Sequence, residues 1–252
     1  MNVIVIVETF VAFIIAITLH EAAHAGMAVL LGDASVVRRG RLSLAPSRQM
    51  TATGTLVAVF LSFSALSGLG WGRAMEVDAQ RMRVGPNAGT ILTALAGPAL
   101  NFALGVAVAA GLALAPNAAS LAATWPGCAA SHGLALQECL STAGPASIIR
   151  LEQFGIIFAV TNIVIALVNL IPLHPLDGYH ILFALLPSHS AIKYRNFAPY
   201  MELILLVVFL ALPLLLAALG AANFNPGGWF AGWANGIVGS ITGGAFGFYP
   251  IL

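Results

Sequence analysis

The chain has 252 residues, of which 60% are hydrophobic and only 8% are charged, and its mean hydropathy is +0.95. Soluble domains are about 45–50% apolar and about 25% charged, so the composition indicates an all-α polytopic membrane protein and excludes an ordinary soluble domain. The net charge of +1 and the lack of a dense Lys/Arg block argue against a nucleic-acid partner.

Several stretches are apolar over about 20 residues, the length that crosses the hydrocarbon core of a bilayer. They cover residues 3–31, 51–71, 88–115, 153–172 and 198–220. A weaker candidate lies in 223–252, a tail rich in glycine and aromatic residues that would either cross the membrane or lie in its interface. We therefore expect about five to six transmembrane helices, with residues 1–222 as the core of the protein and 223–252 as a C-terminal tail.

Positively charged residues indicate which loops face the cytoplasm. Arginine or lysine occurs in 32–50, 72–87 and 186–199, whereas 116–149 has neither. If 51–71 crossed the membrane fully, the two arginine-rich loops beside it would lie on opposite sides. We therefore expect a membrane-associated segment on the cytoplasmic side, between the first and second full spans, that dips in and returns or lies in the interface.

The two cysteines, Cys128 and Cys139, fall in the loop 116–149, which this topology places outside the cell. A disulfide between them and a pair of free thiols are both compatible with the sequence. Two cysteines are too few for a zinc motif.

The first apolar stretch contains HEAAH, residues 20–24, a match to H-E-x-x-H. Residues four apart share one face of a helix, so His20 and His24 can direct ring nitrogens at one metal ion. Glu21 lies beside that face and could take a proton from a water that zinc has activated. An acidic residue at the centre of a bilayer costs about 2.5–3.5 kcal/mol, which favours function over a polar triad that only packs against neighbouring helices.

Hydrolytic zinc sites usually have three protein ligands, and the stretch NLIPLHPLDGYH, residues 169–180, offers the third. Asp177 lies just past the inner end of an apolar stretch, at the depth expected for the two histidines. Pro172 and Pro175 break the helix there, and Gly178 gives the backbone freedom beside the aspartate. The alternative is a simple helix-ending turn at the interface.

These motifs resemble those of the site-2 protease family of intramembrane zinc metalloproteases. HEAAH matches the family's H-E-x-x-H, and the string from Asn169 to Gly178 matches its N-x-x-P-x-x-x-L-D-G. The stretch AGPALN, residues 96–101, is similar to its G-P-x-x-N. Residues 32–55 and 70–77 look like the connecting region of the compact bacterial branch without a PDZ or CBS domain, although GWGRAMEV lacks the lysine and prolines common in the family.

The resemblance implies a cofactor, an activity and a location. His20, His24 and Asp177 would bind one Zn²⁺ per chain, Glu21 would be the general base, and Asn169 would hold the substrate or the oxyanion. The substrates would be membrane-spanning proteins, such as an anti-sigma-factor-like regulator, cut within or near the bilayer during regulated intramembrane proteolysis. The enzyme would be a multi-pass protein of the cell membrane with its active site toward the cytoplasm.

Three further polar residues each have two interpretations. Asn101 either contacts the substrate or supports a metal ligand, or it makes an ordinary interhelical hydrogen bond. His174 and His180 either hydrogen-bond Asp177 or lie at the membrane interface without a metal role.

Two other functions would use the same ligands. A catalytically silent zinc-binding scaffold or regulator of the same fold would have no need of Glu21. A metal transporter would need a second ligand cluster at another depth, which the sequence does not contain. The general base therefore favours the peptidase.

Overall fold

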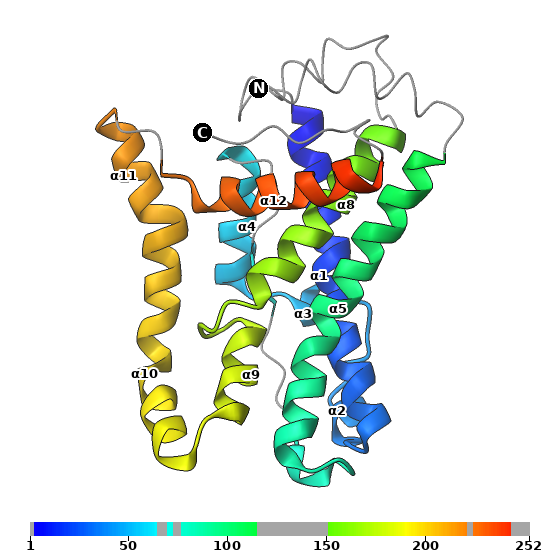
Figure 1. Ribbon diagram of the computed structural model, residues 1–252, viewed down its shortest axis with the longest axis vertical. Helices are drawn as coiled ribbons and strands as arrows, with labels where there is room; N and C mark the ends of the chain where they lie inside the picture. Colours follow the sequence, from blue (N-terminus) through cyan, green and yellow to red (C-terminus); the bar gives the residue numbers. More distant parts are fainter. Residues whose placement is uncertain (1–2, 65–69, 73–76, 115–150, 221–223, 243–252) are drawn as a thin grey trace.

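The computed structural model describes residues 3–64, 70–72, 77–114, 151–220 and 224–242, and within these ranges it consists of helices and turns without a named strand (Figure 1). The predicted outer loop with Cys128 and Cys139 lies outside the described residues. The described elements are α1 (Val3–Leu31), α2 (Ser35–Arg38), α3 (Pro46–Gln49), α4 (Ala52–Ser64), η1 (Ala79–Arg81), α5 (Pro86–Ala113), α8 (Leu151–Asn169), α9 (Asp177–Leu185), α10 (Ser188–Leu206), the π-helical turn η2 (Val207–Ala211), α11 (Leu212–Ala218) and α12 (Pro226–Ile241).

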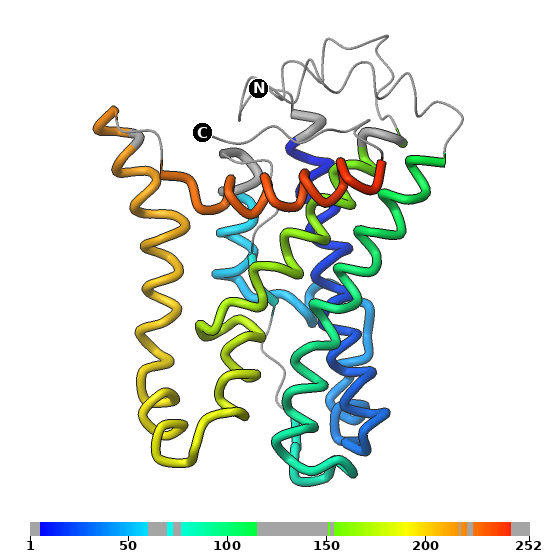
Figure 2. Tube along the Cα trace, in the orientation of Figure 1, coloured from blue at the N-terminus to red at the C-terminus, as the bar shows by residue number. Residues whose placement is uncertain are grey.

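Three long helices form the centre of the protein. α1, α5 and α8 pack against one another, and their inward faces carry fully buried side chains such as Phe13, Ile17 and Ile163. α9 packs against α5 below the end of α8, so the turn between α8 and α9 lies at mid-height of the bundle (Figure 2). This turn carries the second predicted metal motif to the level of the first.

The inner end of α1 is closed by a glycine cap. Gly32 has φ = 118°, and the N–H groups of Gly32 and Asp33 bond to the carbonyls of Val29 and Ala28, as in a Schellman motif. The buried Asp33 carboxylate then accepts hydrogen bonds from the backbone N–H and hydroxyl of Ser35 (2.9 and 2.5 Å) and from the backbone N–H of Asp78 (2.7 Å). One side chain therefore joins the end of α1 to two connecting segments.

The segment 51–71 begins and ends at the same place. Met50 and Gly72 form an isolated antiparallel bridge, and the Thr51 hydroxyl lies 3.5 Å from the carbonyl of Trp71. Between these ends, α4 packs beside α1. The segment thus leaves and returns at one level of the bundle, and its side of the membrane stays a prediction.

Two parts of the chain lie at the edge of this bundle. α10, η2 and α11 form a peripheral column (Ser188–Ala218) that stands apart from the central helices in Figure 1. α12 runs across the long helices and packs on α8 and α5. Its buried Ala231, Ala234 and Val238 join the same apolar cluster as Ile163, so part of the predicted tail packs with the core.

Within the described part of the chain, fewer helices have the length and composition of a membrane span than the sequence predicts for the whole chain. Within the described ranges, three helices are long and apolar enough to cross a membrane, Ile6–Leu31, Pro86–Ala113 and Ser188–Leu216. The predicted span 153–172 is a shorter apolar helix that ends at Asn169, ahead of Pro172. The predicted span 198–220 belongs to a helix that begins at Ser188, because α10 continues through Pro199. The described helices agree with an all-α membrane protein, but five to six spans are not confirmed.

Candidate metal centre

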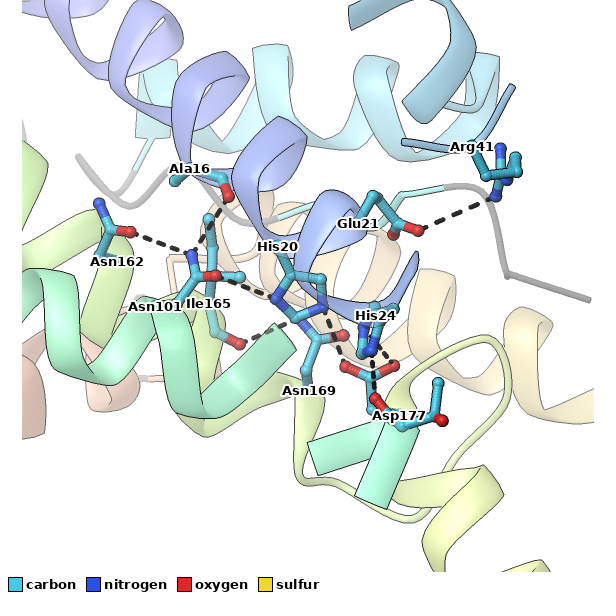
Figure 3. A network of polar contacts seen from close by, with 11 residues as sticks. Ala16, His20, Glu21, His24, Arg41, Asn101, Asn162, Ile165, Asn169 and Asp177 are labelled. Atoms are coloured by element: carbon cyan, nitrogen blue, oxygen red, sulfur yellow. Dashed lines mark hydrogen bonds and ion pairs between the residues drawn. The ribbon is translucent and has the colours of Figure 1, made fainter. Parts of the chain in front are cut away.

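The two histidines of HEAAH are held by α5 through their Nδ1 atoms. His20 Nδ1 lies 3.1 Å from Asn101 Oδ1, and His24 Nδ1 lies 2.6 Å from the carbonyl oxygen of Thr93. A carbonyl only accepts hydrogen bonds, so His24 Nδ1 carries a proton and its Nε2 keeps a lone pair. Both rings are buried, with centroids 4.6 Å apart, and both Nε2 atoms face the turn between α8 and α9 (Figure 3).

Asp177 comes to these rings from the first turn of α9. Its Oδ2 lies 2.9 Å from His20 Nε2, and its Oδ1 lies 3.1 Å from His24 Nε2. The next residue explains the close approach, because a Cβ on Gly178 would lie 2.4 Å from the carbonyl oxygens of Leu170 and Ile171. Gly178 is therefore needed for packing, and the predicted reason, backbone freedom, is wrong, since this residue is helical and has no positive φ.

The three ligand groups enclose a space that suits a metal ion. One atom from each of His20, His24 and Asp177 lies within 4.8 Å of the others. Among the described residues, the buried His24 Nε2 has no hydrogen-bond partner of suitable geometry. A Cβ on Gly97 would lie 2.5 Å from His24 Nε2 and 2.7 Å from His20 Nε2, so the glycine keeps this space open. Two imidazoles and a carboxylate form a donor set that zinc accepts.

Glu21 lies on the neighbouring face of α1 and borders the same cavity. The cavity is also lined by Trp71, Thr93, Asn169 and His180. The Glu21 carboxylate is buried, and Arg41 Nη2 lies 3.9 Å from its Oε2. A Cβ on Gly72 would overlap this carboxylate, at 2.0 Å from Oε1. The returning end of the segment 51–71 thus covers Glu21.

The other predicted site residues, Asn169, His174 and His180, differ in whether they line the cavity. Asn169 lines the cavity, and its amide nitrogen donates to the carbonyl of Ile165 (2.9 Å). His180 also lines the cavity, whereas the ring of His174 packs edge-on against Tyr179. Neither histidine shows a hydrogen bond to Asp177 among the described contacts, so the geometry gives no support to that interpretation.

Some residues of the site were not predicted. Thr93 and Arg41 act through tertiary contacts that no local pattern reveals. Gly97 belongs to the AGPALN stretch that resembles the family's G-P-x-x-N, but its closeness to the two histidines was not predicted. Asn162 is different, because it lies seven residues before Asn169, two turns along the same face of α8. That spacing of two asparagines in an apolar helix was a usable signal.

Comparisons with known proteins agree with this geometry. The model of the family described as Peptidase family M50 matches residues 8–212. The chain is 30% identical over 199 residues to the "Putative zinc metalloprotease YwhC" of Bacillus subtilis (strain 168), and the alignment covers 79% of this chain and 78% of that protein. The comparison with solved structures gives no significant match.

Fold and site together define a helical membrane protein in which two histidines and one carboxylate form a group that could hold a metal ion. The chain belongs to peptidase family M50, the site-2 protease family. The predicted family is thereby confirmed, and the match to a zinc metalloprotease supports a metalloprotease that uses zinc. Members of this family are membrane proteins, in agreement with the apolar helices.

Proposed function

We propose that this protein is an intramembrane zinc endopeptidase that hydrolyses peptide bonds within or near membrane-spanning segments of other proteins. One observation carries the proposal: His20, His24 and Asp177 converge on one space, and Glu21 borders the same cavity. These groups lie on or beside long apolar helices, where buried ionisable residues mark function.

Each residue has a distinct role in this proposal. His20, His24 and Asp177 would hold one zinc ion per chain, which would supply a Lewis acid for activating water and polarising the peptide carbonyl. Glu21 takes the proton of the attacking water on a carboxylate oxygen and passes it to the departing amine. Asn169, which lines the cavity, offers its remaining amide N–H to the substrate backbone or the developing oxyanion.

We further propose that the protein lies in the cell membrane with the cavity toward the cytoplasm. The arginine-rich loops that flank 51–71 support this orientation through the positive-inside rule. A segment cut at that depth belongs to another membrane-spanning protein, such as an anti-sigma-factor-like regulator, and cleavage releases its cytoplasmic part.

The test compares wild type with Glu21→Gln, which removes the base and keeps the three ligands. We expect both proteins to bind zinc, and we expect membrane proteins cut within a spanning segment to be shortened only in cells with the wild type, as measured by mass spectrometry of membrane fractions. Glu202→Gln, the same change in the peripheral column, is the matched control and should behave as wild type. Equal fragment patterns in the wild type and Glu21→Gln, with zinc bound to both, would favour the silent scaffold.

A further inference from the structure

A chain of buried amides leads from α8 to His20 (Figure 3). It starts at the backbone carbonyl of Phe158, which accepts a hydrogen bond from Asn162 Nδ2 at 2.8 Å. A carbonyl has no proton to give, so the amide nitrogen of Asn162 must face Phe158. The amide oxygen of Asn162 therefore faces the other way, toward Asn101.

The same reasoning fixes the orientation of Asn101. Its Nδ2 lies 3.1 Å from Asn162 Oδ1 and 3.4 Å from the backbone carbonyl of Ala16, and both of these atoms accept. Asn101 must therefore turn its nitrogen toward them and its oxygen toward His20 Nδ1, 3.1 Å away. An acceptor at that place requires a proton on His20 Nδ1, which leaves the lone pair on Nε2.

The two histidines differ in how strongly their surroundings favour the tautomer with the proton on Nδ1. His24 Nδ1 meets a backbone carbonyl, whose identity cannot change. His20 Nδ1 meets a side-chain amide, and rotation of that amide would present a donor instead. His20 would then carry its proton on Nε2 and donate it to Asp177 Oδ2, 2.9 Å away, and its metal-binding lone pair would be lost.

We propose that Asn162 is a positioning residue that keeps Asn101 in one orientation and thereby keeps His20 Nε2 available to zinc. Asn162 and Asn101 are both fully buried, so no solvent competes for their hydrogen bonds. The inference rests on the proposed zinc site and concerns zinc affinity rather than turnover. Partners of metal-binding histidines typically contribute about 10–100-fold to metal affinity.

The experiment measures the dissociation constant for zinc by competition with a chromophoric chelator, using the full-length protein in detergent. Asn162→Leu keeps the number and branching of the side-chain heavy atoms and removes the hydrogen bonds, and we expect it to weaken zinc binding by about tenfold, the lower end of that range. Thr161→Val is the matched control, because Thr161 is the preceding residue, fully buried, and its hydroxyl has no hydrogen-bond partner among the residues that the structure describes. We expect it to bind zinc as the wild type does.

A second variant makes the hydrogen bond to His20 independent of Asn162. In Asn101→Asp both side-chain oxygens accept hydrogen bonds, so the orientation toward His20 no longer depends on Asn162. We therefore expect Asn101→Asp and Asn101→Asp/Asn162→Leu to bind zinc equally, whereas Asn162→Leu alone binds it more weakly than the wild type. If Asn162→Leu does not fold, Asn162→Ala removes the same hydrogen bonds with a smaller side chain and is compared with and without Asn101→Asp in its place.

Three results would overturn the proposal: wild-type affinity in Asn162→Leu, the same loss in Thr161→Val, or a further tenfold loss in the double variant. Failure here is distinct from failure of the proposed function, which would show as zinc-loaded wild type without cleavage that depends on Glu21.

Discussion

The central helices and the peripheral column are both apolar, yet they bury very different shares of their surface. In α1, 56% of the most apolar stretch is inside the protein, whereas in the helix Ser188–Leu216 the share is 11%. His20, Glu21 and His24 of α1 are buried in the protein. α5 and α9 supply the polar groups that contact the two histidines. The column keeps Lys193 and Arg195 near one end and exposes several of its leucines, such as Leu203 and Leu215. Burial by protein, rather than hydropathy, decides which apolar helix can carry chemistry.

The largest expected effect is the loss of the third ligand from the centre. Asp177→Ala removes the only oxygen ligand of the group His20, His24 and Asp177, so we expect bound zinc to fall from about one ion per chain to near zero. Elemental mass spectrometry of purified protein measures this directly. Asp78→Ala, a change at a half-exposed carboxylate outside the site, should keep the wild-type content. Zinc retained in Asp177→Ala would mean that the two motifs do not build one site.

Adding a methyl group inside the proposed metal centre should reduce zinc binding almost as strongly as the loss of Asp177. Gly97→Ala places a Cβ 2.5–2.7 Å from the Nε2 atoms of His24 and His20, in the space proposed for the metal, so we expect zinc binding to be lost. Gly111→Ala is the matched control on the same helix, because its Cβ would meet nothing within 4 Å. Wild-type zinc affinity in Gly97→Ala would place the metal elsewhere.

A smaller effect, on thermal stability rather than zinc binding, is expected for substitution of Asp33 at the inner end of α1. Burial acts to raise the pKa of the Asp33 carboxyl, but hydrogen bonds from Ser35 and from the backbone N–H of Asp78 outweigh it and hold the pKa below its usual value. Asp33→Asn sets an amide nitrogen against the N–H of Asp78, and an unsatisfied buried donor costs about 1–3 kcal/mol. We expect a lower midpoint of thermal unfolding at neutral pH.

The pH dependence gives the sign of this effect. Because the folded pKa is depressed, the stabilisation by Asp33 is present above the unfolded pKa of about 3.9 and is lost as the pH falls through the folded pKa. The unfolding midpoints of wild type and Asp33→Asn should therefore converge in acid. Asp78→Asn, at an exposed pair with Arg81, is the control and should change the midpoint little. A constant difference at all pH values would contradict the assignment.

The sequence predicted the local parts of this site and missed the tertiary ones. HEAAH and the Asp177 turn were predicted because helical spacing and helix-breaking prolines are local patterns, and the structure brings both motifs together. The approach of Asn162 to Asn101 depends on how α8 packs against α5, which spacing along one helix does not specify. Gly178 was predicted for a wrong reason. Its small size matters because it packs against Leu170 and Ile171, at the end of the predicted span 153–172, and this contact was not predicted.

The helical class of the fold was predicted, but the bounds and packing of several helices were not. Hydropathy identified α1 and α5 as spans, because each is a single uninterrupted apolar helix. It misplaced the start of the peripheral column, because the polar turns of α10 before Pro199 hide a helix that begins at Ser188. The position of α12 across α8 and α5 was also beyond prediction, since a glycine-rich apolar stretch fits a span and a surface helix equally well.

The smallest expected effect is at the contact between the column and the site. Tyr194 of α10 donates a hydrogen bond to the carbonyl of Pro172 (2.5 Å), and its ring stacks on Tyr179, with centroids 4.9 Å apart. Tyr194→Phe keeps the stacking and removes one hydrogen bond, so we expect a loss of about 0.5–1.5 kcal/mol in unfolding free energy and no change in zinc affinity. Tyr200→Phe, at a 60% exposed position on the same helix, should be neutral. If Tyr194→Phe weakened zinc binding, the column would contribute to the metal centre. The largely exposed column would then share the chemical role that is assigned to the buried central helices.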